Sequence, residues 1–203
     1  MLSLLTLAGL AGCSTMLAGN QAIPAPTSQY DAVIVNASNG QRITVTELAR
    51  QLVDTDVVVV GEYHGHHASH LLQARLQQAL YRQNPAQILS MEQFNLDHQT
   101  AVGAYLAGTT GETEMLEDAN AWDNYKASYR PLVEFARQHQ LPVIAANAPA
   151  DTVRCVGREG KAYLDRLPEA QRSALPQQAF LDTPEYRDKF IDCLLYTSPS
   201  PRD

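Results

Sequence analysis

The feature that most constrains this chain is a run of four valines at residues 57–60, bounded by Asp56 and Gly61. β-Branched side chains favour extended backbone, and an unbroken apolar run of this length is typical of a strand that is buried on both faces. Such strands occur mostly in parallel sheets whose faces are covered by helices. The run therefore predicts a parallel sheet, provided that the chain alternates between strands and helices.

The chain shows that alternation after the valine run. The expected elements are, in order, a helix over residues 68–82, a strand over 87–94, helices between 97 and 139, a strand over 141–149 and a helix from 150. Strands that alternate with helices are typical of βαβ units. We therefore expect an α/β fold, a parallel sheet of βαβ units flanked by helices, with a small helical subdomain inserted at about residues 95–139.

The segment before the valine run predicts a β-hairpin and a short helix. Two β-rich stretches flank Asn39-Gly40, a pair of residues that tolerates positive φ and is common in tight turns. Thr46 lies directly before the helical stretch ELARQLVD and is expected to cap it. The folded part is therefore expected to begin near Tyr30.

The first residues predict an exported protein with a lipid anchor. Residues 1–13 are apolar and end in small residues and Cys13, as in a lipoprotein signal peptide with a lipobox. The alternative is a cleaved signal peptide without lipid. Residues 14–29 are small, polar and proline-containing, as expected of a tether. By its similarity to bacterial sorting signals, Ser14 indicates the outer membrane, where lipid on Cys13 would anchor the domain.

The carboxyl end of the chain differs from the rest in composition. Residues 194–203, LLYTSPSPRD, are expected to be a non-native tail, so that the native domain at residues 30–193 is incomplete. Cys155 and Cys193 could pair in an exported protein, but the sequence leaves their geometry open. The net charge of −7 and the scattered Lys and Arg residues exclude a typical nucleic-acid-binding surface.

Polar residues gather where the predicted strands end. Gly61, Glu62 and His64 follow the first strand, Glu92 lies near the end of the second, and Asn147 lies near the end of the third. Ligands of open parallel sheets bind outside the carboxyl ends of the strands. A charge at a buried strand end is costly unless it is paired or bound to metal. We therefore expect Glu62, His64 and Glu92 to bind a divalent metal ion or to activate water.

A simpler interpretation of the same residues remains open. Glu62 can cap the following helix, since a carboxylate is favourable near a helix N-terminus. His66 and His67 are expected to be solvated residues of the first turn, and His70 is compatible with either role. The chain lacks the His-Glu-x-x-His sequence of zinc proteases. No closed set of four metal ligands can be identified from spacing alone.

Aromatic residues are concentrated in WDNYKASYRP, residues 122–131. Trp122, Tyr125 and Tyr129 lie at helical spacing, which most often indicates core packing. A phenol can also ligate ferric haem while flat aromatic side chains pack on the macrocycle. The Cys-x-x-Cys-His sequence that attaches c-type haem is absent. The sequence alone therefore leaves both roles open for these tyrosines.

Several motifs in order over about residues 31–157 resemble the ChaN family, haem-binding-uptake lipoproteins of the Tiki superfamily. They are VTELARQLVDTDVVVVGEYHGHHASHLLQARLQQAL, SMEQF, AYLAG, YRPLVEFAR and PVIAANAP. The resemblance implies a parallel α/β domain with a smaller helical part, anchored to the outer membrane and linked to iron acquisition. It also implies haem bound through a tyrosine, for which Tyr129 is the first candidate and Tyr125 the second.

The resemblance implies a function and an alternative to it. The function is that of a haem- or iron-binding outer-membrane lipoprotein in haem or iron uptake, with a homodimer and an outer-membrane transport partner as further expectations. The alternative is a metal-dependent hydrolase, because other members of the superfamily use a Gly-x-x-His motif and a glutamate as a hydrolytic site. Five residues fall on the family's motif positions: Gly61, Glu62, His64, Glu92 and Asn147.

Overall fold

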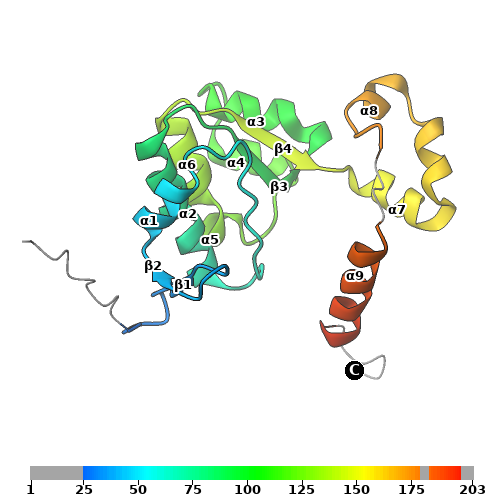
Figure 1. The fold of residues 1–203 in the computed structure, drawn as a ribbon. Helices are drawn as coiled ribbons and strands as arrows, with labels where there is room; N and C mark the ends of the chain where they lie inside the picture. Colours follow the sequence, from blue (N-terminus) through cyan, green and yellow to red (C-terminus); the bar gives the residue numbers. More distant parts are fainter. Residues whose placement is uncertain (1–24, 179–182, 198–203) are drawn as a thin grey trace, which may run out of the picture. The chain divides into compact units, whose positions relative to one another are not determined.

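The computed structural model describes residues 25–178 and 183–197 of the chain (Figure 1). These residues fall into two compact units, the first ending at Gln83 and the second beginning at Asn84. Cys13, the expected signal peptide and most of the expected tether lie outside the described residues. None of the described helices has the length and apolar composition needed to cross a membrane.

A hairpin opens the first unit. Strands β1 (Ile34–Val35) and β2 (Arg42–Ile43) pair in antiparallel fashion, as the sequence predicts. The connecting loop is longer than a two-residue turn, and the backbone N–H of Asn36 closes it by donating to the carbonyl of Gln41 at 2.9 Å. Of the Asn-Gly pair, only Gly40 has a positive φ, of 70°. Glycine adopts that conformation without the steric penalty of a Cβ atom.

Helix α1 (Val45–Gln51) begins with a capping box at Thr44, so the prediction of Thr46 as the cap is wrong. The Thr44 hydroxyl accepts the backbone N–H of Glu47 at 3.1 Å, and the Glu47 carboxylate accepts the backbone N–H of Thr44 at 2.7 Å. The bond from the Thr44 backbone N–H, and then that from its hydroxyl, lower the pKa of the Glu47 carboxyl. The Thr-x-x-Glu pattern that marks a capping box runs from Thr44 to Glu47, and the helix therefore begins at Val45, the residue after Thr44.

The valine run at residues 57–60 is not a strand, which corrects the expectation from sequence. Within the described part of the chain no strand pairs with it, and three of its four side chains are exposed, with Val57 at 72% and Val59 at 88%. β-Propensity describes how well a side chain fits a paired and half-buried surface, and it does not provide the pairing. Glu62 and His64 therefore follow a segment without regular secondary structure.

Helix α2 (His67–Gln83) packs on α1 and completes the first unit. Its N-terminus is capped by the ring of His66, whose Nδ1 accepts the backbone N–H of Ser69 at 3.2 Å. The helix buries alanine and leucine side chains but also two polar ones, His70 and Gln77. Buried polar side chains on a helix require hydrogen-bonding partners. The partners of His70 belong to the candidate site described below.

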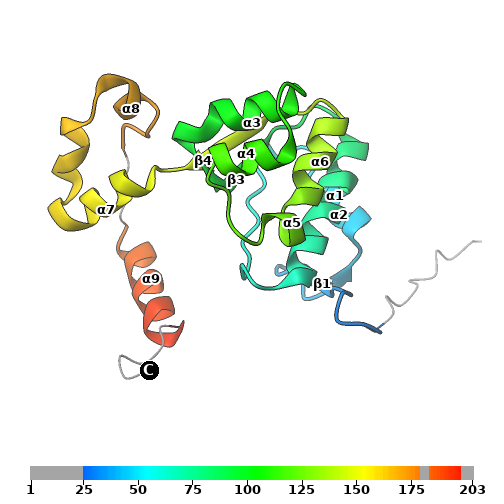
Figure 2. The ribbon, with the colours of Figure 1, turned by 180° about the vertical axis from the view of Figure 1, so that it is seen from behind.

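The second unit contains a parallel pair of strands, β3 (Leu89–Asn95) and β4 (Val143–Asn147), with Leu89 opposite Val143. The helices between them are η1 (Leu96–His98), α3 (Gln99–Leu106), α4 (Glu112–Asp118), α5 (Tyr125–Ser128) and α6 (Arg130–Gln138). Figure 2 shows α3 and α4 beside the two strands. The α/β class is therefore confirmed, with small sheets.

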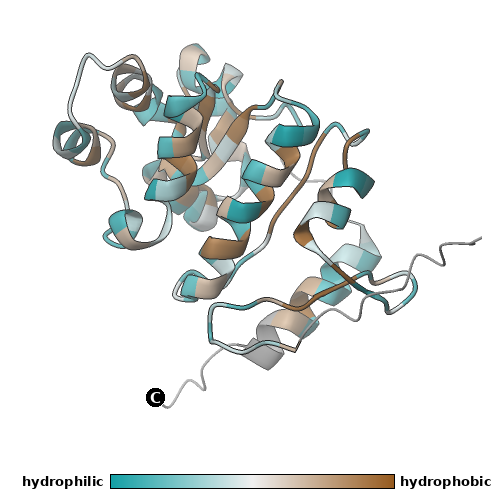
Figure 3. Ribbon diagram, turned by 90° about the vertical axis from the view of Figure 1, so that its left-hand side faces the viewer, coloured by the Kyte–Doolittle hydropathy of each residue, from teal (hydrophilic) through white to brown (hydrophobic). Residues whose placement is uncertain are grey.

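Helices also follow β4. They are α7 (Ala150–Glu159), η2 (Lys161–Arg166), α8 (Glu169–Ser173) and α9 (Pro184–Thr197). Helix α9 includes the first residues of the expected tail, 194–197, and no disulfide joins Cys155 and Cys193. In Figure 3 hydrophobic and hydrophilic residues alternate along the helices, as expected of helices that bury one face.

Charged and phenolic side chains join the helices of the second unit. The Tyr105 hydroxyl on α3 donates to the Glu134 carboxylate on α6, and the Arg137 guanidinium lies 4.5 Å from the centre of the Tyr105 ring. Arg130 on α6 pairs with Glu112 on α4 at 2.7 Å. Burial, followed by the bond to Glu134, raises the pKa of Tyr105 to about 12. These contacts hold α3 and α4 to α6.

Replacing Tyr105 by phenylalanine is expected to lower the free energy of unfolding by about 2 kcal/mol at neutral pH, because it removes a hydrogen bond to a charged group. The folded-state pKa of Tyr105 lies above its ordinary value of 10. Its ionisation therefore costs no stability below pH 10, and stability falls as the pH rises from 10 towards 12. Urea unfolding at pH 7 to 11.5 measures both effects.

The matched control is Tyr63→Phe, since the Tyr63 side chain is 80% exposed. The control should unfold like the wild type, and Tyr105→Phe should flatten the decline above pH 10. Equal stability of the two variants across this range would contradict the role of Tyr105.

Candidate functional site

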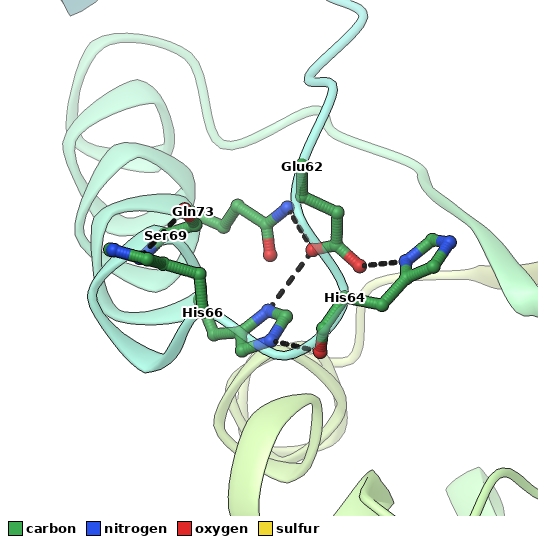
Figure 4. A network of polar contacts seen from close by, with 6 residues as sticks. Glu62, His64, His66, Ser69 and Gln73 are labelled. Atoms are coloured by element: carbon green, nitrogen blue, oxygen red, sulfur yellow. Dashed lines mark hydrogen bonds and ion pairs between the residues drawn. The ribbon is translucent and has the colours of Figure 1, made fainter. Parts of the chain in front are cut away.

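A polar network surrounds the carboxylate of Glu62, directly after the valine run (Figure 4). Its Oε1 lies 3.0 Å from Nδ1 of His64, and its Oε2 lies 3.0 Å from Nδ1 of His70 and 2.6 Å from Nε2 of Gln73. The Glu62 side chain is only 6% exposed. A carboxylate removed from water in this way is tolerated when nitrogen donors replace the lost hydration.

Two local features bring these residues together. The backbone N–H of His66 donates to the carbonyl of Tyr63 at 2.8 Å, which closes a tight turn between Glu62 and the start of α2. His70 and Gln73 are three residues apart on α2 and therefore lie on the same side of the helix. The turn reverses the direction of the chain, so that the Glu62 side chain contacts this side of α2.

The ring of His70 joins the carboxylate to the backbone. Its Nε2 lies 3.0 Å from the carbonyl oxygen of His64, and because a carbonyl only accepts, this nitrogen carries a hydrogen. Its Nδ1 lies 3.0 Å from Oε2 of Glu62. The buried His70 thus contacts both the Glu62 side chain and the backbone of His64.

His64 is the exposed member of the network, with 56% of its side chain accessible to solvent. When its Nδ1 donates to the Glu62 carboxylate, the lone pair of the neutral ring lies on Nε2. Histidines that bind metal usually donate their other ring N–H to a carboxylate or carbonyl in the same manner. The arrangement is suited to binding a metal or accepting a proton.

An apolar groove adjoins this network within the first unit. It has a volume of about 460 Å³, within the usual range for small-molecule sites, and Gly61 lies on its wall. Its other lining residues come from β1, α1, the valine run and α2, among them Ile34, Leu48, Leu52, Val58, Leu72 and Leu76. Gln73 also lines the groove and donates to Glu62, so it connects the apolar wall to the polar network.

The other residues expected at the strand ends belong to the second unit. Glu92 is exposed on β3, and the Asn147 side chain at the end of β4 donates to Oδ1 of Asn95 at 3.0 Å. Among residues 25–178 and 183–197, no group of three or more His, Cys, Asp or Glu residues is arranged to hold a metal ion. The structure therefore brings Glu62 and His64 together, without a third such residue beside them in the described part of the chain.

The candidate tyrosines are buried in the second unit. Tyr125 and Tyr129 are each 1% exposed, and their rings pack at 5.8 Å against Phe94 and 5.9 Å against Trp122, respectively. Burial, and then neighbouring negative charge, raises the pKa of Tyr125 and disfavours its phenolate. In this conformation both rings act as core residues, and a role in haem ligation requires a hydroxyl group to become accessible.

Analysis of the sequence missed His70 and Gln73 as partners of Glu62. The available signal was a set of polar residues at helical spacing, His70, Gln73 and Gln77, beside the apolar stripe of α2. Polar residues beside the apolar stripe of a helix can indicate a buried network of hydrogen bonds. The expectation that His66 and His67 are exposed is confirmed, although His66 also caps the helix.

The comparisons with known proteins give one match. The family model described as "Haem-binding uptake, Tiki superfamily, ChaN" matches residues 48–199, most of the chain. No curated protein and no solved structure matches the chain. The matched range includes the second half of α1, most of the groove lining, the network around Glu62 and both parallel strands.

Replacing Gln73 by leucine should lower the free energy of unfolding by about 2 kcal/mol, because it removes a donor from a buried carboxylate. Gln83→Leu, at the exposed end of the same helix, is the matched control and should have little effect. Urea denaturation followed by circular dichroism measures both variants. Equal losses would show that the Gln73–Glu62 bond does not stabilise the network.

Proposed function

We propose that this chain, which belongs to the ChaN family of haem-binding uptake proteins in the Tiki superfamily, binds haem and takes part in its uptake. The family match over residues 48–199 carries the proposal. Membership indicates a function related to haem binding or uptake, and most of the groove lining and the network around Glu62 lie within the matched range.

The described residues of the first unit are compatible with haem. Haem presents a large apolar face, and the groove offers an apolar wall of suitable size. Haem iron accepts imidazole or phenolate as an axial ligand. The exposed imidazole of His64 meets this requirement directly, whereas Tyr125 and Tyr129 are buried.

The proposal extends to the cell envelope. Lipid on Cys13 would anchor the domain to the outer membrane, and the tether would hold it near a membrane partner. There the protein would receive haem, or another iron source, from an outer-membrane transport partner, or hand it on. A homodimer is part of the same proposal.

A hemin titration followed by absorbance tests haem binding. A saturable shift of the Soret band is expected for the full chain. If Tyr129 or Tyr125 is the ligand, the bands of a ferric phenolate complex appear, and Tyr129→Phe or Tyr125→Phe removes them. Tyr186→Phe, at an exposed position, is the matched control. The absence of any Soret shift in the wild type would overturn the proposal.

The pairing of Glu62 with His64 favours a second candidate, metal-dependent hydrolysis. A histidine held by a carboxylate is the usual arrangement of a general base, and the same pair could contribute ligands to a divalent ion. The hypothesis expects purified protein to contain a divalent metal that is lost in the Glu62→Ala/His64→Ala double variant. Elemental analysis checks it, and an unchanged metal content would exclude this site.

A further inference from the structure

We infer that the second unit binds a small zwitterionic amino acid, of about the size of alanine, in a pocket where strands β3 and β4 end. The pocket has a volume of about 130 Å³ and shares no lining residue with the apolar groove of the first unit. The inference goes beyond the proposed haem binding, because it concerns another part of the chain and another ligand. The pocket is lined by residues that include Leu96, Asp97, Pro149, Thr152, Ala174 and Leu175.

The pocket lies where a parallel sheet usually binds its ligands. Leu96 and Asp97 directly follow β3, and Pro149 follows β4 and leads into α7 (Figure 1). Ligands of open parallel sheets bind outside the carboxyl ends of the strands. The Asn147 side chain at the end of β4 donates to Oδ1 of Asn95 at the end of β3, at 3.0 Å. This hydrogen bond holds the two strand ends together.

Donors for a carboxylate lie at the start of α7. The backbone N–H groups of the first three residues of a helix have no carbonyl partner within that helix. In α7 these residues are Ala150, Asp151 and Thr152, and the N-cap Pro149 has no side-chain oxygen to accept from them. A helix N-terminus of this kind favours a bound anion. Asp151 in the same turn pairs with Arg154 at 3.1 Å, which partly offsets its negative charge.

The side chain of Thr152 indicates that the pocket holds a ligand. Thr152 is only 7% exposed, and it lines the pocket. Its hydroxyl has no hydrogen-bond partner within the described part of the chain, whereas most buried polar side chains in proteins have one. A hydroxyl group can donate a hydrogen bond to a carboxylate. A ligand carboxylate in the pocket would therefore satisfy both Thr152 and the first N–H groups of α7.

The charge of Asp97 specifies the other end of the ligand. Asp97 is exposed and also lines the pocket. Its carboxylate repels a simple anion, whereas it forms a charge-assisted hydrogen bond with an ammonium group. Leu96, Pro149 and Leu175 provide apolar surface for a short aliphatic side chain. A carboxylate, an ammonium group and a short aliphatic side chain together describe a small α-amino acid.

The volume of the pocket limits the size of this ligand. Pockets for drug-sized molecules usually measure about 300–1,000 Å³, and this pocket measures about 130 Å³. At about 30 Å³ per molecule, the pocket has room for about four water molecules. Glycine and alanine are of this size, whereas phenylalanine and haem are too large. The pocket should therefore discriminate among amino acids by size.

Titration of the full chain, labelled with nitrogen-15 and followed by NMR, tests the site. L-Alanine at millimolar concentrations should cause saturable shifts of the backbone amide signals of residues 150–152. Propionate lacks the ammonium group and ethylamine lacks the carboxylate, so each should bind about tenfold more weakly than alanine. Phenylalanine should not compete with alanine, because it exceeds the volume of the pocket.

Two variants and a control assign the contacts. Asp97→Asn should weaken alanine binding about tenfold, because it removes the charge that pairs with the ammonium group. Thr152→Val keeps the shape of the side chain and should weaken the binding of both alanine and propionate. Asp123→Asn, which removes an exposed carboxylate elsewhere in the second unit, is the matched control and should bind alanine like the wild type. Circular dichroism shows whether each variant is folded.

The outcomes separate this inference from the proposed function. The absence of saturable shifts with alanine, or shifts that do not involve residues 150–152, would overturn the inference. Equal binding of alanine and propionate, unchanged in Asp97→Asn, would show a simple anion site and would also overturn it. Each of these results leaves haem binding untouched, because hemin binding is measured separately by absorbance.

Discussion

The site of the first unit depends on the burial of one carboxylate. Glu62 is 6% exposed, and a charge so far removed from water costs several kcal/mol unless donors compensate for it. The compensating donors lie on α2, and the turn after Glu62 brings them within reach. His64 occupies a defined position because Glu62 and His70 contact its ring and its backbone. An exposed residue outside regular secondary structure thereby acquires the fixed orientation that ligand binding requires.

Burial of polar groups organises the second unit in a different way. The Tyr105 hydroxyl donates a hydrogen bond to the Glu134 carboxylate and so joins α3 to α6. The pair stabilises the packing of these helices without offering an accessible donor. The hydroxyl of Tyr125 is buried and has no hydrogen-bond partner among the described residues. Its ring packs on Phe94 of β3. The aromatic residues Tyr125 and Tyr129 are thus part of the core of the second unit. In the first unit, by contrast, the imidazole of His64 lies at the surface.

Patterns within short segments predicted much of the fold, whereas contacts between segments were harder to predict. The hairpin, the helices and the parallel pair follow from turn residues and periodicity, which are local properties. The valine run was wrongly predicted as a strand because a strand depends on a neighbour that composition does not reveal. Glu62 and His64 were expected at one site because both follow the valine run, and the structure places them in contact. The roles of His70 and Gln73 depend on how that turn returns the chain to α2. Tyr125 and Tyr129 would show the same helical spacing whether they packed in the core or bound a ligand. Only their burial in the structure distinguishes these two roles.

The cost of exposing a buried donor bears on the haem binding that we propose. A ligand that must first leave the core has its affinity reduced by the fraction of molecules in the open state. Each 1.4 kcal/mol needed to open the packing around Tyr125 or Tyr129 would weaken binding tenfold. The ring of His64 is already accessible, and its Nδ1 lies 3.0 Å from the Glu62 carboxylate. A tyrosine ligand would therefore require the core of the second unit to open, whereas a ligand held by the network around Glu62 would leave that core intact.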